Sequence, residues 1–290
     1  MERAALKLRR LTGLMMFVAL VVLSVPCHAQ EWWNDQWTYR KKVSFDTTAA
    51  GADIADNQSE VPVLLRLHTG NFDFNNAREG GEDIRFVSSD NTTVLKHHIE
   101  KYDIIDEMGF VWVSVPRLSG HFDKDFIYMY YGNENAMEAQ DPKGTWDINQ
   151  AAVYHFDEVE GAPQDATAYD NHAASYSVGQ GLPAVIGNGA AFSGVDQIVI
   201  PATPSLQFEN GFTFSTWLRL SQPVEEGTIF ARGQDDRFMA LAVNGTSVCF
   251  RLQTMEGRLY TTDDCLEVGL ESWHHVAVTV KPDDRIALFL

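Results

Sequence analysis

The chain is short of cysteine, basic residues and long hydrophobic runs, and each shortage limits what the protein can be. Its 290 residues include 3 cysteines, and 22 Lys and Arg stand against 40 Asp and Glu for a formal charge of −18. A surface of that sign repels a phosphate backbone, which excludes nucleic acid as a partner. The content of 45% hydrophobic and 21% charged residues excludes a disordered chain and indicates about two folded domains.

Residues 1–29 have the pattern of a secretory signal peptide. Four positive residues precede an apolar run over Leu11–Val25, and Ala29 is a small residue suited to cleavage. The run is short for a membrane span of about 20 residues, although an uncleaved anchor is the alternative. Lipid attachment at Cys27 is a second alternative, which the preceding Pro26 disfavours. We therefore expect an exported protein, periplasmic or extracellular.

Export changes the charge and the fate of the cysteines. Cleavage after Ala29 removes four of the 22 bases and one of the 40 acids, which leaves 18 against 39 and a charge of −21. Two cysteines remain, Cys249 and Cys265, in a compartment where disulfides persist. We expect them to be bridged, with two buried free thiols as the alternative.

The local strand pattern supports this bridge. Asn244-Gly245 favours a hairpin turn, and Glu256-Gly257 turns the chain again. If the second turn is centred between its two residues, Cys249 lies opposite Asp264, one residue from Cys265. A single β-bulge would then bring the two sulfurs together.

Alternation of apolar and polar residues with period two predicts an all-β protein with two antiparallel β-sandwich domains in series. We place the first domain at residues 30–148 and find no long amphipathic helix in it, with one helical turn expected over Glu134–Ala139. Its predicted strands are Trp37–Asp46, Val61–His68, Asp83–Ser88, Val94–Tyr102, Gly109–Pro116 and Phe126–Tyr131.

The second domain is expected over residues 149–290. The last strand ends at Leu290 with no partner after it, so we expect a sandwich that is incomplete as given. The predicted strands are Ala152–Phe156, Gln197–Ile200, Phe212–Leu220, Thr228–Ala231, Phe238–Val243, Ser247–Gln253, Arg258–Thr262, His274–Val280 and Arg285–Leu290.

Five sequence blocks of the second domain resemble the laminin-G-like, concanavalin A-like jelly rolls. The blocks are YHFDE at 154–158, DAT at 165–167, GNGAAFSG at 187–194, FTFSTWL at 212–218 and SWHHVAV at 272–278. The resemblance implies two curved antiparallel sheets and, in many relatives, a calcium ion and a glycan or protein ligand.

The first domain resembles a bacterial domain family of unknown function that is found beside such jelly rolls. The matching text is WWNDQWTYRKK at 32–42, VPVLL at 61–65, DIRF at 83–86, HHIE at 97–100 and IYMYYGN at 127–133. Relatives of this arrangement are similar to the periplasmic front ends of MotA, TolQ or ExbB type proton channels. The resemblance therefore implies a possible association with an inner-membrane proton channel, in a segment beyond Leu290.

Aromatic side chains are the first candidate ligand contacts, because a ring face stacks on the C–H surface of a sugar. Trp32, Trp33 and Trp37 are the candidates, with a first strand that closes the sandwich as the alternative. Trp112, Trp217 and Trp273 lie on predicted strands, and we expect them in the core.

Hard oxygen ligands in acidic loops are the second candidate site, since calcium prefers them. Asp165, Asp170, Asn171 and Asp196 lie in loops of the second domain, near the position where the resemblance implies an ion. The alternative is ordinary turn chemistry of Asp and Asn.

Two further sites are disfavoured. The adjacent pair His97-His98 places its rings on opposite faces of a strand, and although His98 shares a face with Glu100, a third zinc ligand is not evident. Related jelly rolls that cleave laminarin carry Glu-x-Asp-x-x-Glu on a strand, and the sequence contains no such run.

We therefore expect a non-catalytic, exported binding protein that recognises a glycan or an envelope protein through its jelly roll. The second interpretation is the periplasmic region of a TolQ or ExbB type energised transport complex, whose ligand would be a protein. The third is a glycan-cleaving hydrolase.

Overall fold

The fold is taken from a computed structural model of the chain. It describes residues 32–208, 210–234, 237–254, 256–262, 264–281 and 285–290. The predicted signal peptide, residues 1–29, lies outside the described residues. Within the described part of the chain, no helix is long and apolar enough to cross a membrane.

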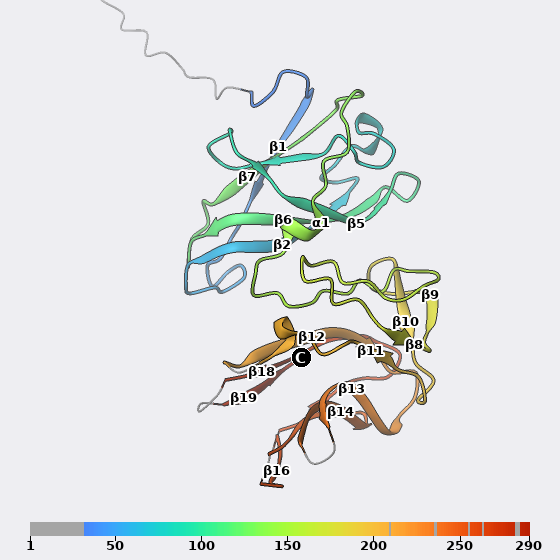
Figure 1. Cartoon of the computed structure of the whole chain (residues 1–290). Helices are drawn as coiled ribbons and strands as arrows, with labels where there is room; N and C mark the ends of the chain where they lie inside the picture. Colours follow the sequence, from blue (N-terminus) through green and yellow to red (C-terminus); the bar gives the residue numbers. More distant parts are fainter. Residues whose placement is uncertain (1–31, 209, 235–236, 255, 263, 282–284) are drawn as a thin grey trace, which may run out of the picture. The chain divides into compact units, whose positions relative to one another are not determined.

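The first region is an antiparallel sandwich of two sheets (Figure 1). One sheet has the order β1 (Tyr39–Ser44), β7 (Phe126–Tyr131), β3 (Arg85–Val87) and β4 (Val94–Leu95). The other has the order β2 (Gln58–His68), β6 (Met108–Leu118) and β5 (His97–Asp103). A short 3-10 helix, Phe74–Asn76, lies in a loop. All six predicted strands are confirmed, with Val94–Tyr102 divided at Lys96.

Strand alternation builds the core between these sheets. Along β6, Val111, Val113 and Val115 are fully buried while the residues between them are partly exposed, as expected for one inward face. Ile127 and Met129 of β7 meet them in the same cluster.

The predicted helical turn over Glu134–Ala139 is wrong, and the helix α1 instead covers Pro142–Thr145. The Asp141 side chain caps it by accepting the Gly144 backbone N–H, and Pro142 fits the first turn because its missing N–H has no partner there. The cap was readable in the sequence as Asp-Pro, which marks a helix start.

Residues 146–174 form no strand, so the predicted strand Ala152–Phe156 is wrong. Phe156 has φ +57°, which a strand residue does not adopt, and the Val153 N–H donates to the Asp165 side chain instead of to a ladder. Two small antiparallel pairs follow: β8 (Ser175–Tyr176) with β11 (Ile198–Val199), and β9 (Gly179–Pro183) with β10 (Asn188–Ala191). A 3-10 helix at Pro204–Leu206 ends this segment.

The second region is a sandwich of two further antiparallel sheets. The first has the order β12 (Phe212–Arg219), β18 (Trp273–Val280) and β19 (Ile286–Phe289). The second has the order β13 (Val224–Gln234), β14 (Arg237–Gly245), β15 (Ser247–Gln253) and β16 (Leu259–Thr261), with β17 (Leu266–Glu267) also paired to β15. Their core includes Leu241 and Phe250 from one sheet and Val276 and Val278 from the other.

Trp217 and Trp273 are exposed by 51% and 39%, so the expectation that they lie in the core is wrong. The inward face of β12 is set by Phe212 and Phe214, and Trp217 belongs to the other phase. Its ring lies 5.2 Å from that of His275 on β18.

The predicted disulfide between Cys249 and Cys265 is confirmed. The β14–β15 turn lies at Gly245-Thr246, one residue later than predicted, with φ +63° at the glycine. The register of β15 against β17 differs by two residues from its register against β16, and continuing the β17 pairing by one residue places Cys265 opposite Cys249. The two cysteines are thus brought together by a two-residue difference in register between β16 and β17.

Candidate functional site

The outer face of β14 carries small residues. Leu241 and Val243 lie in the core, and because successive side chains point to opposite faces, Ala240 and Ala242 lie on the other face of the sheet, where both are themselves buried. An alanine pair on the outer face of a central strand leaves space above the sheet.

The neighbouring strand β15 supplies a cation to the same face. Its core residues are Val248 and Phe250, so Cys249 and Arg251 point outward. Arg251 pairs in register with Ala240, which places the aliphatic part of the arginine side chain beside the space over the two alanines.

The third strand, β13, is irregular where it borders this space. Its register against β14 shifts between Val224 and Gly227, so Glu226 lies in a β-bulge, a device that re-aims side chains. At its other end Gly233 has φ +136°, and a Cβ there would lie 2.1 Å from the Arg237 carbonyl oxygen. The close approach of the two strands therefore requires glycine.

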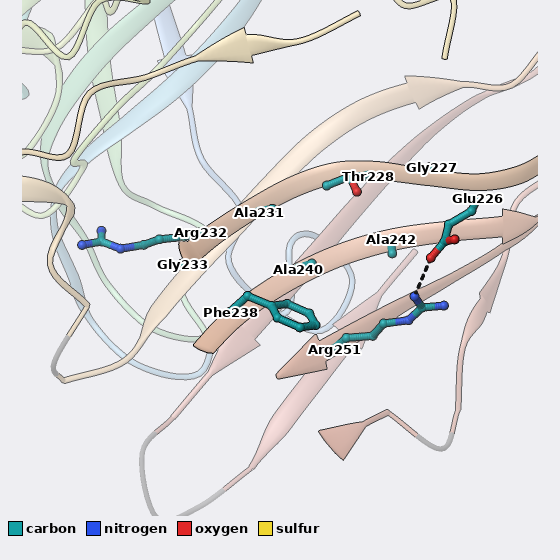
Figure 2. Close-up of a pocket in the computed structure, with 10 residues that line it drawn as sticks. All are labelled: Glu226, Gly227, Thr228, Ala231, Arg232, Gly233, Phe238, Ala240, Ala242 and Arg251. Carbon is teal, nitrogen blue, oxygen red and sulfur yellow. Dashed lines mark hydrogen bonds and ion pairs between the residues drawn. The ribbon is translucent and has the colours of Figure 1, made fainter. Parts of the chain in front are cut away.

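Together these strands form a recess of about 290 Å³, which we call the Arg251 recess. Figure 2 shows Ala240 and Ala242 between the Phe238 ring and the pair formed by Glu226 and Arg251. The lining residues are Glu226, Gly227, Thr228, Ala231, Arg232, Gly233, Phe238, Ala240, Ala242 and Arg251.

The charged pair of the recess is only loosely held. Arg251 Nη1 donates to Glu226 Oε1 over 3.2 Å, and the two side chains are exposed by 32% and 73%. Such an exposed single contact stabilises the fold by at most about 1 kcal/mol. The other lining arginine, Arg232, holds its guanidinium 4.9 Å from the Phe208 ring and points away from Arg251 (Figure 2).

The disulfide lies beside the recess. Cys249 precedes Arg251 by two residues on the same face of β15 and pairs in register with Ala242. The bridge therefore fixes the strand that presents the guanidinium.

The residues of the Arg251 recess can bind but offer little for catalysis. Phe238 supplies an aromatic face, Thr228 a hydroxyl group and Arg251 a planar set of donors, which are the groups that orient a sugar. Among the described lining residues, Glu226 is the one carboxylate.

The tryptophans predicted as ligand contacts lie in the first region, away from these strands in sequence. Trp37 is buried and donates through Nε1 to the Asp83 carbonyl. Trp33 packs against Trp37 with ring centroids 4.9 Å apart, while Trp32 is 41% exposed. Trp32 is therefore the one with the most ring surface open to a ligand.

Asp165, predicted as a calcium ligand, is buried and organises the segment after α1. Its carboxylate accepts the backbone N–H groups of Val153, Thr167 and Asn171 and the Thr167 hydroxyl, over 2.7–3.0 Å. A carboxylate with these donors is already satisfied without an ion.

The other predicted calcium ligands are engaged separately. Asn171 is buried and donates to the Ala151 carbonyl, Asp170 contacts Lys143 at 2.6 Å, and Asp196 accepts the Ser193 N–H. Within the part of the chain that is described, no group of three or more His, Cys, Asp or Glu side chains is placed to hold a metal ion.

His98 and Glu100 do gain a third neighbour that the sequence did not reveal. His155, from the segment after α1, lies with Nδ1 3.2 Å from Glu100 Oε1, and its ring centroid is 5.0 Å from that of His98. Trp112 Nε1 donates to Glu100 Oε2 over 2.6 Å. Burial alone would raise the pKa of Glu100, but the contacts with His155 and Trp112 together outweigh burial and lower the pKa.

Two stretches of the chain match known families. Residues 192–290 match the family described as the concanavalin A-like lectin/glucanases superfamily. The second region is a concanavalin A-like domain. Residues 80–172 match the domain of unknown function DUF2341. No curated protein and no solved structure matches the chain.

These matches confirm the two resemblances in their order along the chain. The Arg251 recess lies wholly within the concanavalin A-like domain, and His98, Glu100 and His155 lie wholly within the DUF2341 range. The predicted boundary near residue 148 falls inside that range and stays a prediction. A domain of the concanavalin A-like class suggests carbohydrate binding or hydrolysis.

Proposed function

We propose that the protein binds a glycan, without cleaving it, in the Arg251 recess. The observation that carries the proposal is the arrangement of Ala240 and Ala242 as a floor between the Phe238 ring and the Arg251 guanidinium. A sugar ring lies on such a floor with its C–H face toward an aromatic side chain, while polar groups at the rim fix its hydroxyls.

The size of the recess favours a short stretch of glycan. Its volume of about 290 Å³ lies just below the roughly 300–1,000 Å³ typical of small-molecule sites. A protein partner, as in an energised envelope transport complex, would need about 800 Å² of surface on each side. The recess therefore favours the glycan interpretation over the transport interpretation, and a proton-channel association stays a prediction.

The lining favours binding over hydrolysis. Glycosidases use two carboxyl groups about 5–9.5 Å apart, one of them a general acid. The described lining residues include one carboxylate, Glu226, which is 73% exposed and contacts Arg251. A single carboxylate in the lining does not supply both of the groups that such a mechanism needs.

Export is the proposed setting. The disulfide is consistent with an extracytoplasmic location, because such bonds persist in oxidising compartments. In this setting the DUF2341 region serves as scaffold or as a contact for an envelope partner.

A glycan array probed with the exported chain, residues 30–290, tests the proposal. We expect a glycan to bind without release of reducing ends, and Ala240→Leu to abolish binding because the new side chain fills the recess. Ser215→Leu is the control, since Ser215 is exposed on the outer face of β12 and a leucine there adds bulk away from the recess. Binding that survives Ala240→Leu and is lost in Ser215→Leu would place the site on the other sheet and refute the proposal.

A further inference from the structure

We propose that the Arg251 recess selects glycans that carry a carboxylate, namely chains containing uronic acid units. This inference rests on the proposed function and goes further by naming the ligand class. It starts from charge. The protein carries 40 acidic and 22 basic residues, yet the recess presents the guanidinium of Arg251, while the second lining arginine, Arg232, points away toward Phe208.

The structure shows that the Arg251 guanidinium binds a carboxylate at this position. Glu226 accepts one hydrogen bond from Arg251, from Nη1 to Oε1 over 3.2 Å. Among the described residues, no other acid contacts this guanidinium. A guanidinium presents five N–H donors and binds carboxylates best through two parallel bonds, so the Glu226 contact leaves most of its capacity unused.

Glu226 is placed so that it can be displaced. The Glu226 side chain is 73% exposed in the bulge of β13, where no core residue fixes it. When Glu226 moves away, Arg251 is not left as a buried unpaired charge, because the Arg251 side chain is itself 32% exposed. A ligand carboxylate that binds bidentately therefore replaces a weak exposed contact with a stronger one.

The geometry around Arg251 suits a sugar acid. Phe238 and Ala240 are successive residues on the outer face of β14, so their positions along the strand are about 7 Å apart. Arg251 of β15 pairs with Ala240. A pyranose ring above Ala240 is in reach of the Phe238 ring on one side, and a carboxylate on its edge is in reach of the guanidinium on the other. Neutral sugars lack the group that Arg251 would bind.

Calorimetry with trigalacturonate and with its methyl ester tests the inference, because the ester replaces each carboxylate with a neutral group and leaves the sugar rings and hydroxyls unchanged. The protein is the exported chain, residues 30–290. We expect the acid to bind at least about tenfold more tightly than the ester, as charge-assisted bidentate bonds provide. Arg251→Gln should equalise the two affinities, and Arg251→Lys should restore only part of the difference, because a lysine lacks the planar pair of donors.

A second pair of variants tests displacement. Glu226→Gln frees the guanidinium and should tighten binding of the acid about three- to tenfold without changing binding of the ester. Glu225→Gln is the matched control, because it removes the same charge from the adjacent exposed residue, which does not line the recess.

The outcomes separate this inference from the proposed function. Equal affinity for acid and ester in the wild type, both lost in Ala240→Leu, would overturn the uronate selection and leave glycan binding intact. Failure of all array glycans and both oligomers to bind folded protein would overturn both. Equal effects of Glu226→Gln and Glu225→Gln would show that Glu226 does not compete for Arg251.

Discussion

His155 contacts Glu100 across 55 positions of sequence, with 3.2 Å between Nδ1 and Oε1. Both side chains are largely buried, with 12% of His155 and 9% of Glu100 exposed, and Trp112 donates to the second carboxylate oxygen. The contact joins the strand-free segment after α1 to β5, and both partners lie within the residues that match DUF2341.

We expect Glu100→Ala to destabilise the first region by roughly 3 kcal/mol, because it leaves the buried polar groups of His155 and Trp112 without their acceptor. Chemical denaturation followed by tryptophan fluorescence measures the loss. Glu134→Ala, which truncates an exposed acid of the same region, should change stability by less than about 0.5 kcal/mol. Equal effects of the two variants would contradict the structural role of the contact.

Acid should destabilise the same region through its buried histidines. Burial, reinforced by the neighbouring His155, lowers the pKa of His98 to about 4, against the attraction of Glu100 and Asp157. Because the unfolded chain protonates near pH 6.5, this stability is present above that pH and is lost as pH falls toward about 4, on the order of 3 kcal/mol in total.

The measurement is the melting temperature at several pH values between 4 and 7.5. His98→Phe should flatten part of the pH dependence, since it keeps a ring and removes the titrating group. Part should remain, because burial also lowers the pKa of His97 to about 4. His121→Gln, at an exposed histidine, should leave the profile as in the wild type. An unchanged profile in His98→Phe would argue against its buried neutral state.

Asp165→Asn should destabilise the chain by about 2–3 kcal/mol, because an amide cannot accept all the bonds that the buried carboxylate takes from three backbone N–H groups and a hydroxyl. Asp196→Asn, at a partly exposed loop position, is the control. Melting temperatures in calcium and in chelator should agree within error for the wild type. A large calcium-dependent rise that Asp165→Asn removes would instead support the predicted ion site.

Removing the disulfide should affect stability and binding together. In the chain-entropy model a bridge that closes this 16-residue separation stabilises the fold by about 3 kcal/mol. We expect the double variant Cys249→Ser with Cys265→Ser to lose that amount and to bind glycan more weakly, since Cys249 fixes β15 beside Arg251. Loss of stability with unchanged affinity would show that the bridge does not position the recess.

Strands in which apolar and polar residues alternate clearly were predictable from the sequence, and segments whose backbone groups bind side chains distant in sequence were not. The six strands of the first region and the β14–β15 hairpin follow from period two and from the turn glycine at Gly245. The segment 152–156 has similar apolar content, yet its N–H at Val153 finds the Asp165 carboxylate, a partner that only the folded chain reveals.

Trp217 was expected in the core because its side chain is large and apolar, but its position in the alternation of β12 decides which face it lies on. In Phe212–Arg219 it shares its phase with Thr213, Ser215 and Arg219, which marks an outward face. The same argument could have found the recess, since Ala240, Ala242 and Arg251 are outward in the predicted hairpin register. The contact of Glu226 with Arg251 could not be foreseen, because it depends on a bulge in β13.

The central claim is tested most directly by mapping amide chemical shifts of the ¹⁵N-labelled exported chain during titration with the glycan found on the array. We predict that the largest changes cluster at Phe238, Ala240, Ala242 and Arg251. Changes that cluster instead around the exposed Trp217 and Trp273 would contradict the account and place the ligand on the outer face of β12 and β18.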